Sequence, residues 1–219
     1  MYSRATYLYM ACLVIALLGC APLGTRPSDE DVERFSASQH YNAEKRQFEN
    51  RLPNVMEAMN RRIFSMDSFK AWLDGPAQGR PPGPLPAHQT DMAAFRARDE
   101  SLKIIWLGHS SFLLNMAGRI ILVDPVFSQA ASPISRFVRR FQDPPISLQM
   151  LPTIDFILIS HDHYDHLDMK TIEFFIELET RFIVPLGVKN HLTGWEIAAE
   201  RITEMDWWET AIFSEITFI

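Results

Sequence analysis

The sequence predicts a layered α/β protein, and three features of the chain support this fold class. Short apolar runs recur from about residue 101 onward, and turn-forming residues separate them. Segments with the spacing of a buried helix face lie between several of these runs. Hydrophobic residues make up 47% and charged residues 22% of the 219 residues, a balance typical of a globular protein with a packed core.

The apolar runs are the predicted strands. They comprise residues 102–108, 110–116, 119–125, 155–160, 181–187, 202–208 and 215–219. After the fourth run, Ile172, Phe175 and Ile176 give a predicted helix a buried face, and this helix closes near residues 180–181. Asp168 could cap its start by accepting a backbone N–H. A second, short helix is predicted through Trp195.

The region before residue 101 is predicted to extend this domain. Residues 20–53 are polar and predict a tether with an irregular lead-in. Apolar side chains then recur at helical spacing, so residues 54–73 predict an amphipathic helix. These side chains are Val55, Met59, Ile63 and Met66. Packing against the domain is the more common role of such a stripe, and a position on a membrane surface is the alternative. A proline-rich connector then completes a helical extension over residues 54–100.

The N-terminus predicts export and lipidation. Arg4 precedes an apolar run over residues 7–18, which is too short to cross a bilayer comfortably but fits the core of a secretory signal. The sequence LLGC that ends at Cys20 resembles the lipobox of bacterial lipoproteins, so residues 1–19 would be the signal peptide. An ordinary signal peptide with a chance cysteine is the alternative. Ala21 favours the periplasmic face of the outer membrane if the cell is Gram-negative.

Charge and cysteine content restrict the chemistry. The formal net charge of −6 argues against a nucleic-acid binder, which usually carries a basic face. Cys12 and Cys20 are the only cysteines in the sequence. If Cys20 is lipidated and residues 1–19 are removed, the mature chain has no free thiol for a disulfide, a nucleophile or a metal. A bound metal would therefore be held by nitrogen and oxygen atoms.

The segment ILISHDHYDHLD, residues 157–168, predicts a metal site. A strand that ends at His161 delivers the following side chains to the edge of a sheet. His161 and His163 are two residues apart, so both rings can point the same way in an extended loop. Asp165 and His166 follow in the turn and aim at a neighbouring point. Two adjacent metal positions are therefore predicted, an arrangement that can catalyse hydrolysis.

The motif HDHYDH resembles the signature of the metallo-β-lactamase superfamily, whose fold is an αββα sandwich with a two-metal site. The segments IIWLGHSSFLL, ILVDPVFS, VPLG and MDWWE resemble one branch of it, the hydrolases similar to N-acylphosphatidylethanolamine-hydrolysing phospholipase D. By this resemblance His161 and His163 bind one metal, and Asp165 and His166 bind the other. The resemblance also implies a catalytic role for Asp165 in orienting the metal-bound hydroxide. The two divalent ions would be zinc, with iron or manganese as alternatives.

Two further residues lie in matching segments near this motif. Asp124 is expected either to contact a metal ligand and hold it in position or to form a turn. His109 is expected to be a hydrogen-bonded structural residue rather than a ligand.

The sequence departs from the superfamily after His166. There the superfamily supplies a third histidine, a bridging aspartate and a last histidine, but this chain has only His191. We therefore expect residues 101–219 to be a partial, C-terminally truncated domain that holds the N-terminal half of the sandwich. Its last strand, residues 215–219, would then form an apolar, unpaired sheet edge.

These observations predict a metal-dependent hydrolase anchored to a membrane through lipidated Cys20. A hydroxide bound by two metals would attack a phosphodiester such as a phospholipid, with activity impaired by the missing ligands. A lactonase-type hydrolase of the same superfamily is one alternative, and a non-catalytic lipoprotein remnant is the other. The expected partners are the membrane and a lipid or other small phosphodiester or ester, with no nucleic acid. The sequence predicts no oligomeric state.

Overall fold

The computed structural model describes residues 24–52, 55–63, 65–68, 70, 81–132, 138–213 and 215–219. The predicted signal peptide, Cys20 and part of the proline-rich connector lie outside these ranges. The chain forms two compact units, which are described separately. The smaller is Ser28–Ala87, and the larger contains His88–Ile219 together with the segment that ends at Pro27.

The smaller unit contains helix α2 (Asp29–Phe35), the hairpin of β1 (Tyr41–Asn42) and β2 (Gln47–Phe48), and helix α3 (Val55–Ile63). Ser28 and Asp31 form a reciprocal capping box that starts α2. The Phe35 ring packs against the rings of Tyr41 and Phe48, with centroid distances of 5.8 and 5.4 Å. The lead-in was therefore wrongly predicted to be irregular, because a non-local aromatic cluster orders it. Helix α3 covers the first part of the predicted amphipathic helix, and residues 71–73 lie outside the described ranges.

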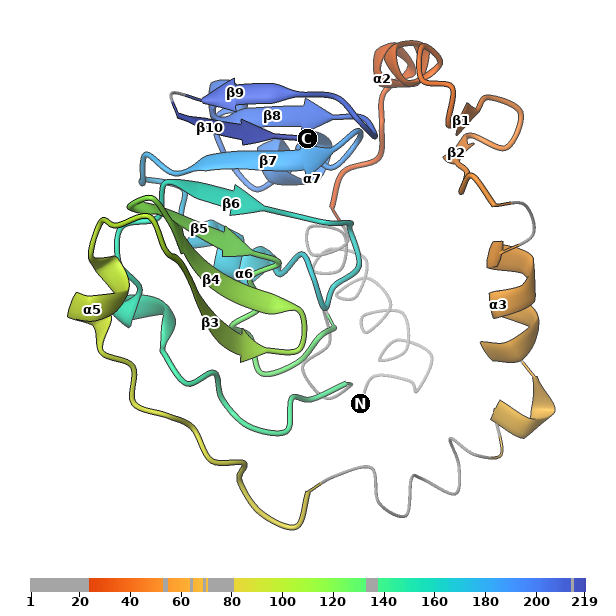
Figure 1. Cartoon of the computed structure of the whole chain (residues 1–219). Coiled ribbons are helices and arrows are strands. Elements are labelled where there is room, and N and C mark those ends of the chain that lie inside the picture. The colour runs from red at the N-terminus through yellow and green to blue at the C-terminus, as the bar shows by residue number, and fades with distance from the viewer. Residues whose placement is uncertain are drawn as a thin grey trace, which may run out of the picture. The chain divides into compact units, whose positions relative to one another are not determined.

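The larger unit is built on a six-stranded mixed sheet with the order β3-β4-β5-β6-β7-β8 (Figure 1). The strands are β3 (Leu102–Gly108), β4 (Ser111–Met116), β5 (Arg119–Val123), β6 (Phe156–Leu158), β7 (Arg181–Pro185) and β8 (Ile202–Met205). Strands β3 to β5 are antiparallel neighbours, whereas β5 to β8 run parallel. Each strand lies within a predicted apolar run, and the predicted mixed α/β fold is confirmed.

The strand directions bring several connecting turns to one edge of the sheet. Parallel strands β5 to β8 end on the same side, as their arrowheads in Figure 1 show. Strand β3 runs in the same direction as β5, because each is antiparallel to β4. The turns after β3, β5, β6, β7 and β8 therefore all lie at this edge, which we call the carboxyl edge.

The two faces of the sheet carry different layers. Helices α6 (Met169–Glu173) and α7 (Lys189–Gly194) pack on one face, where Ile172 and Leu192 join the main core. The other face carries a hairpin of β9 (Ala211–Phe213) and β10 (Ile216–Phe218), whose phenylalanines contact Phe156. Side chains alternate between the two layers along each inner strand. Leu122, Ile157 and Phe182 face the helices, and Ile121, Phe156 and Ile183 face the hairpin.

Some predicted boundaries differ from the structure. The last strand, β10, is not an unpaired edge, because it pairs with β9 and buries Ile216. Trp207 and Trp208 were predicted in a strand but follow β8 in a turn. Helix α5 (Met92–Arg96) and the 3-10 turns η2 (Leu148–Met150) and η3 (Ala199–Arg201) were not predicted. Among the described residues, no helix combines the length and apolar content needed to cross a membrane.

Candidate metal centre

The predicted metal motif forms a tight turn between β6 and α6 at the carboxyl edge. Two consecutive backbone N–H groups, those of His166 and Leu167, donate to the carbonyl oxygen of His163 at 2.9 and 2.8 Å. The Leu167 side chain is buried in the main core directly after the turn. Leu167 therefore anchors the turn in the core, and the polar side chains of residues 161–166 are at least partly exposed.

Asp124 holds this turn from the end of the neighbouring strand β5. Its Oδ1 accepts from the backbone N–H of Ser160 at 2.7 Å, and its Oδ2 accepts from the Ser160 hydroxyl at 2.7 Å. The same Oδ2 lies 2.8 Å from Nδ1 of His166. Asp124 also has a φ of +42°, a left-handed conformation that aspartate tolerates better than most residues. The two roles considered for Asp124, ligand support and turn formation, thus occur together in the structure.

The contact with Asp124 orients the His166 ring. A carboxylate beside Nδ1 favours a proton on that nitrogen and leaves Nε2 free to act as a ligand. Nε2 is the atom that faces Asp165, at 3.7 Å from its Oδ2. The contact with Asp124 therefore fixes the orientation of the His166 ring and directs its Nε2 toward Asp165.

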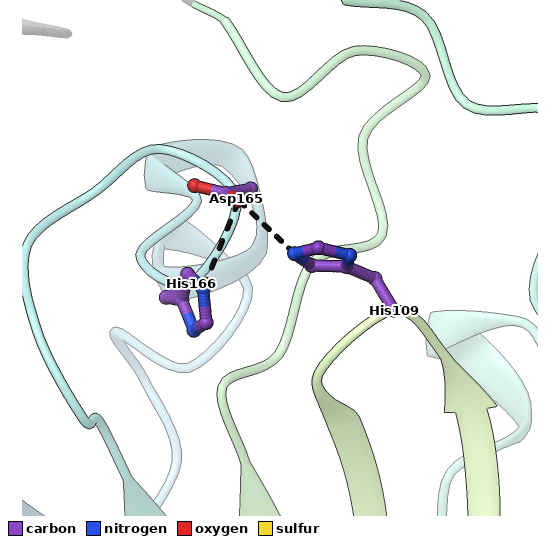
Figure 2. Close-up of side chains that lie close together, drawn as sticks. All are labelled: His109, Asp165 and His166. Atoms are coloured by element: carbon purple, nitrogen blue, oxygen red, sulfur yellow. Dashed lines mark hydrogen bonds and ion pairs between the residues drawn. The ribbon is translucent and has the colours of Figure 1, made fainter. Parts of the chain in front are cut away.

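His109 joins the predicted residues from the β3–β4 turn. Figure 2 shows the His109 ring directed at Asp165, and its Nε2 lies 3.0 Å from the Asp165 Oδ2. His109, Asp165 and His166 each offer a ligand atom, and these atoms lie within 4.8 Å of one another. His109 was expected to be a hydrogen-bonded structural residue rather than a ligand, and it does form a hydrogen-bond contact, with the predicted ligand Asp165. The available signal was its position at the end of a strand that reaches the same sheet edge.

His161 and His163 lie beside this trio. The His161 ring centroid lies 4.0 Å from that of His166 and 4.6 Å from that of His163. The Ser160 hydroxyl lies 2.9 Å from Nδ1 of His161, so this side chain also has a supporting partner. The four predicted ligands are thus brought together in one turn. The tightest set of donor atoms, however, includes His109 in place of His161 and His163.

The local electrostatics favour metal-binding forms of these side chains. Burial, helped by the neighbouring His166 and His163, lowers the pKa of His161 and so favours its neutral, ligating form. Burial would raise the pKa of Asp165. A backbone hydrogen bond, His166 and His109 outweigh it and hold that pKa below its ordinary value. Asp165 is therefore ionised, as a ligand must be.

Asp168 anchors the far side of the turn. It occupies the N-cap position of α6, but its side chain makes no capping hydrogen bond to that helix. Instead its Oδ2 accepts from the backbone N–H groups of Phe127 and Ser128, at 3.2 and 2.9 Å. The predicted cap is therefore a clamp between the end of the metal turn and the segment that follows β5.

The donor set of the turn fits a divalent transition metal. The predicted ligands supply imidazole nitrogens and one carboxylate, which suit zinc, iron and manganese. Each of the two best-supported donors, His166 and Asp165, has a partner that orients it. Such supporting contacts are typical of metal ligands.

A family comparison agrees with this chemistry. Residues 119–219 match the model of the beta-lactamase superfamily domain. This part of the chain is similar to a beta-lactamase superfamily domain. The metal turn and the strands β5 to β10 lie within it, whereas His109 precedes it.

Several named proteins are similar to part of this chain. An uncharacterized protein of Mycobacterium tuberculosis is 40% identical over 64% of this chain and 38% of its own length. The N-acyl-phosphatidylethanolamine-hydrolyzing phospholipase D 1 of Caenorhabditis elegans is 35% identical over 59% of this chain and 38% of its own length. A metal-dependent hydrolase of Caldivirga maquilingensis is 40% identical over 39% of this chain and 36% of its own length. The chain thus spans less than two fifths of each relative's length.

Proposed function

We propose that this protein is a metal-dependent hydrolase that acts on phosphodiesters, with phospholipids as the substrate class. The observation that carries the proposal is the gathering of His161, His163, Asp165 and His166 in one supported turn. The relative from Caenorhabditis elegans, which is named for phospholipid hydrolysis, supports the choice of a phosphodiester. We propose in addition that lipidated Cys20 anchors the protein at the cell envelope.

The residues of the turn would hold two divalent ions, His161 and His163 one and Asp165 and His166 the other. Bound ions supply Lewis acidity toward a phosphoryl oxygen and lower the pKa of water. The chain's own contribution is positioning. Asp124 fixes the ring of His166, and His109 lies beside Asp165, so the donor atoms keep their places while substrate binds.

Metal content tests the proposal directly. We expect the purified protein to bind about two equivalents of divalent metal per chain in equilibrium dialysis against buffer that contains zinc, measured by inductively coupled plasma mass spectrometry. Because His163 is a predicted ligand whose side chain is exposed, His163→Ala should lower the metal content to about half or less, with an unchanged circular dichroism spectrum. Hydrolysis of bis(p-nitrophenyl) phosphate should fall at least about a hundredfold in this variant.

A matched control is His88→Ala, which removes an exposed histidine that precedes the sheet. This variant should keep the metal content and the hydrolysis rate of the unsubstituted protein. Metal below a tenth of an equivalent in the unsubstituted protein would contradict the proposal and favour a non-catalytic lipoprotein. Cleavage of an acyl lactone in place of the phosphodiester would favour the lactonase alternative.

A further inference from the structure

Three tryptophans lie exposed at the carboxyl edge. Trp106 is in the last part of β3, and its side chain is 58% exposed. Trp207 and Trp208 follow β8, with exposed fractions of 50% and 72%. The metal turn follows β6, between these strands in the sheet order (Figure 1). Large aromatic rings thus flank the candidate metal centre on both sides.

Two of these tryptophans have distinctive local features. Nε1 of Trp106 donates to the carbonyl oxygen of His109 at 2.8 Å, which satisfies the polar atom and leaves the ring in solvent. Trp208 has a φ of +70°, an uncommon conformation for a bulky residue. Tryptophan combines an apolar ring with one polar N–H, and it gathers at the interface between lipid and water.

The N-terminal segment reaches the same edge. The backbone N–H of Thr25 donates to Nδ1 of His191 at 3.0 Å, and His191 belongs to α7, which follows β7. Nε2 of the same ring lies 3.6 Å from Oδ2 of Asp162, within the metal turn. This histidine thus links the lead-in segment to the candidate site.

The close approach of this segment depends on two glycines. Gly24 has a φ of +76°, and a Cβ at this position would lie 1.8 Å from Nδ1 of His191. A Cβ at Gly194 would lie 2.2 Å from Oγ1 of Thr25. No larger residue fits at either position without a shift of the segment, so the docking of Gly24 and Thr25 on α7 is specific.

The docking of Gly24 and Thr25 on α7 limits the distance between this helix and the predicted lipid anchor, Cys20. Thr25 lies five positions after Cys20. A fully extended chain spans about 3.3–3.6 Å per residue, so this stretch reaches about 18 Å at most. If Cys20 carries lipid, the point where Thr25 docks on α7 is held within about that distance of the lipidated residue.

The charged residues at the carboxyl edge indicate which kind of lipid surface it would bind. Asp162, Asp206 and Glu209 lie there together with Lys189 and Arg140, so the edge carries charges of both signs and is not the basic cluster that attracts anionic lipids. Insertion of apolar rings, rather than charge attraction, would therefore provide the contact. A zwitterionic surface is the suitable partner.

We propose that the carboxyl edge is a lipid-contacting face, on which Trp106, Trp207 and Trp208 insert into a zwitterionic bilayer surface and hold the metal turn against it. The proposal deepens the proposed function, on which it rests for the role of the turn, because it places a phospholipid substrate beside the ligands. It uses the docked Gly24 and Thr25 as the link between the anchor and this face.

Tryptophan fluorescence tests this contact. The processed, lipidated full chain is reconstituted in vesicles of equal parts phosphatidylcholine and phosphatidylethanolamine. In one sample the phosphatidylcholine carries bromine on its acyl chains, which quenches tryptophans that reach the acyl region. We expect the emission to fall in the brominated vesicles and the quenched fraction to stay unchanged at high salt. In the double variant Trp207→Ser/Trp208→Ser the quenched fraction should fall at least about threefold, because the most exposed rings are gone.

Ile212→Ser is the matched control, because Ile212 is 70% exposed and lies beside the start of β7, at the edge opposite the metal turn. It should keep the quenched fraction of the unsubstituted protein. Equal emission of the unsubstituted protein in brominated and ordinary vesicles would overturn the proposal and favour a protein partner for this edge. Equal losses in Ile212→Ser and the double variant would overturn it as well.

Quenching of the unsubstituted protein in brominated vesicles tests the lipid contact even if the double variant fails to fold. Metal content and hydrolysis of a soluble phosphodiester, measured on the same preparations without vesicles, test the proposed function separately. Intact metal binding with unquenched tryptophans would overturn the lipid-contacting face alone.

Discussion

At the scale of single residues, Asp124 determines how the metal turn presents its ligands. One carboxylate oxygen accepts a hydrogen bond from the backbone N–H of Ser160. The other accepts hydrogen bonds from the Ser160 hydroxyl and from Nδ1 of His166. Both oxygens are therefore used as acceptors, and the side chain is buried. Only a group with two acceptor oxygens satisfies all three donors, so an amide of the same shape cannot replace it.

Asp124→Asn should weaken metal binding by about 10- to 100-fold, the usual effect of losing a contact that supports a ligand. An amide NH₂ would face either the backbone N–H of Ser160, which it repels, or Nδ1 of His166. In the second case the ring proton would move to Nε2 and block the ligand atom. Asparagine tolerates the positive φ, so the backbone is preserved. Competition with a fluorescent zinc chelator measures the affinity.

The control for this variant is Asp155→Asn at the opposite edge of the sheet. Asp155 also accepts from a backbone N–H, that of Ile120, and pairs with Arg119. It has no contact with the metal turn, so zinc affinity should not change. Equal affinities of Asp124→Asn and the unsubstituted protein would show that His166 needs no support from this carboxylate.

At the scale of elements, the segment after β5 and helix α6 are joined by a buried carboxylate. Asp168 is fully buried and receives four donors, because the hydroxyl groups of Ser128 and Thr171 add to the two backbone N–H groups. The metal turn lies between these elements in the sequence. The clamp therefore fixes the helical end of the turn, as Asp124 fixes its strand end.

Asp168→Ala should lower the free energy of unfolding by about 3–5 kcal/mol, because several buried donors lose their acceptor at once. Urea unfolding followed by circular dichroism measures the loss. Asp91→Ala is the control, because Asp91 caps the exposed start of α5 and its removal should cost about 1 kcal/mol. If the two substitutions cost the same, Asp168 is not the clamp that its contacts indicate.

The elements also show what a sequence can predict. Apolar runs located β3 to β8 and β10, since each has an inward face. The hairpin of β1 and β2 was missed, because its short strands depend on the ring of Phe35. In the site, the local turn was predicted from its spacing. The contact of His109 with Asp165 was not predicted, because it joins residues 56 positions apart across the sheet. The support of a ligand by Asp124, 42 positions from His166, was expected only from the family resemblance.

At the scale of the whole chain, the larger unit leaves part of its sheet uncovered. The hairpin of β9 and β10 covers strands β5 to β8 on one face, through Phe156 and Ile183. On the edge strand β3, the side chains of Leu102 and Ile104 are both more than half exposed. They alternate along the strand and so point to one face. An apolar edge strand of this kind is a site for self-association.

We expect the protein to self-associate with rising concentration through this strand, and Ile104→Lys to raise the apparent dissociation constant at least about tenfold. The substitution removes a large apolar side chain from the contact. It also places a charge on the edge strand β3, which opposes pairing with another strand. Sedimentation velocity over a concentration series measures the effect. Leu178→Lys is the control, because it makes the same change in charge at an exposed apolar residue away from β3. A monomer at every concentration would show that the exposed side chains of β3 do not drive association.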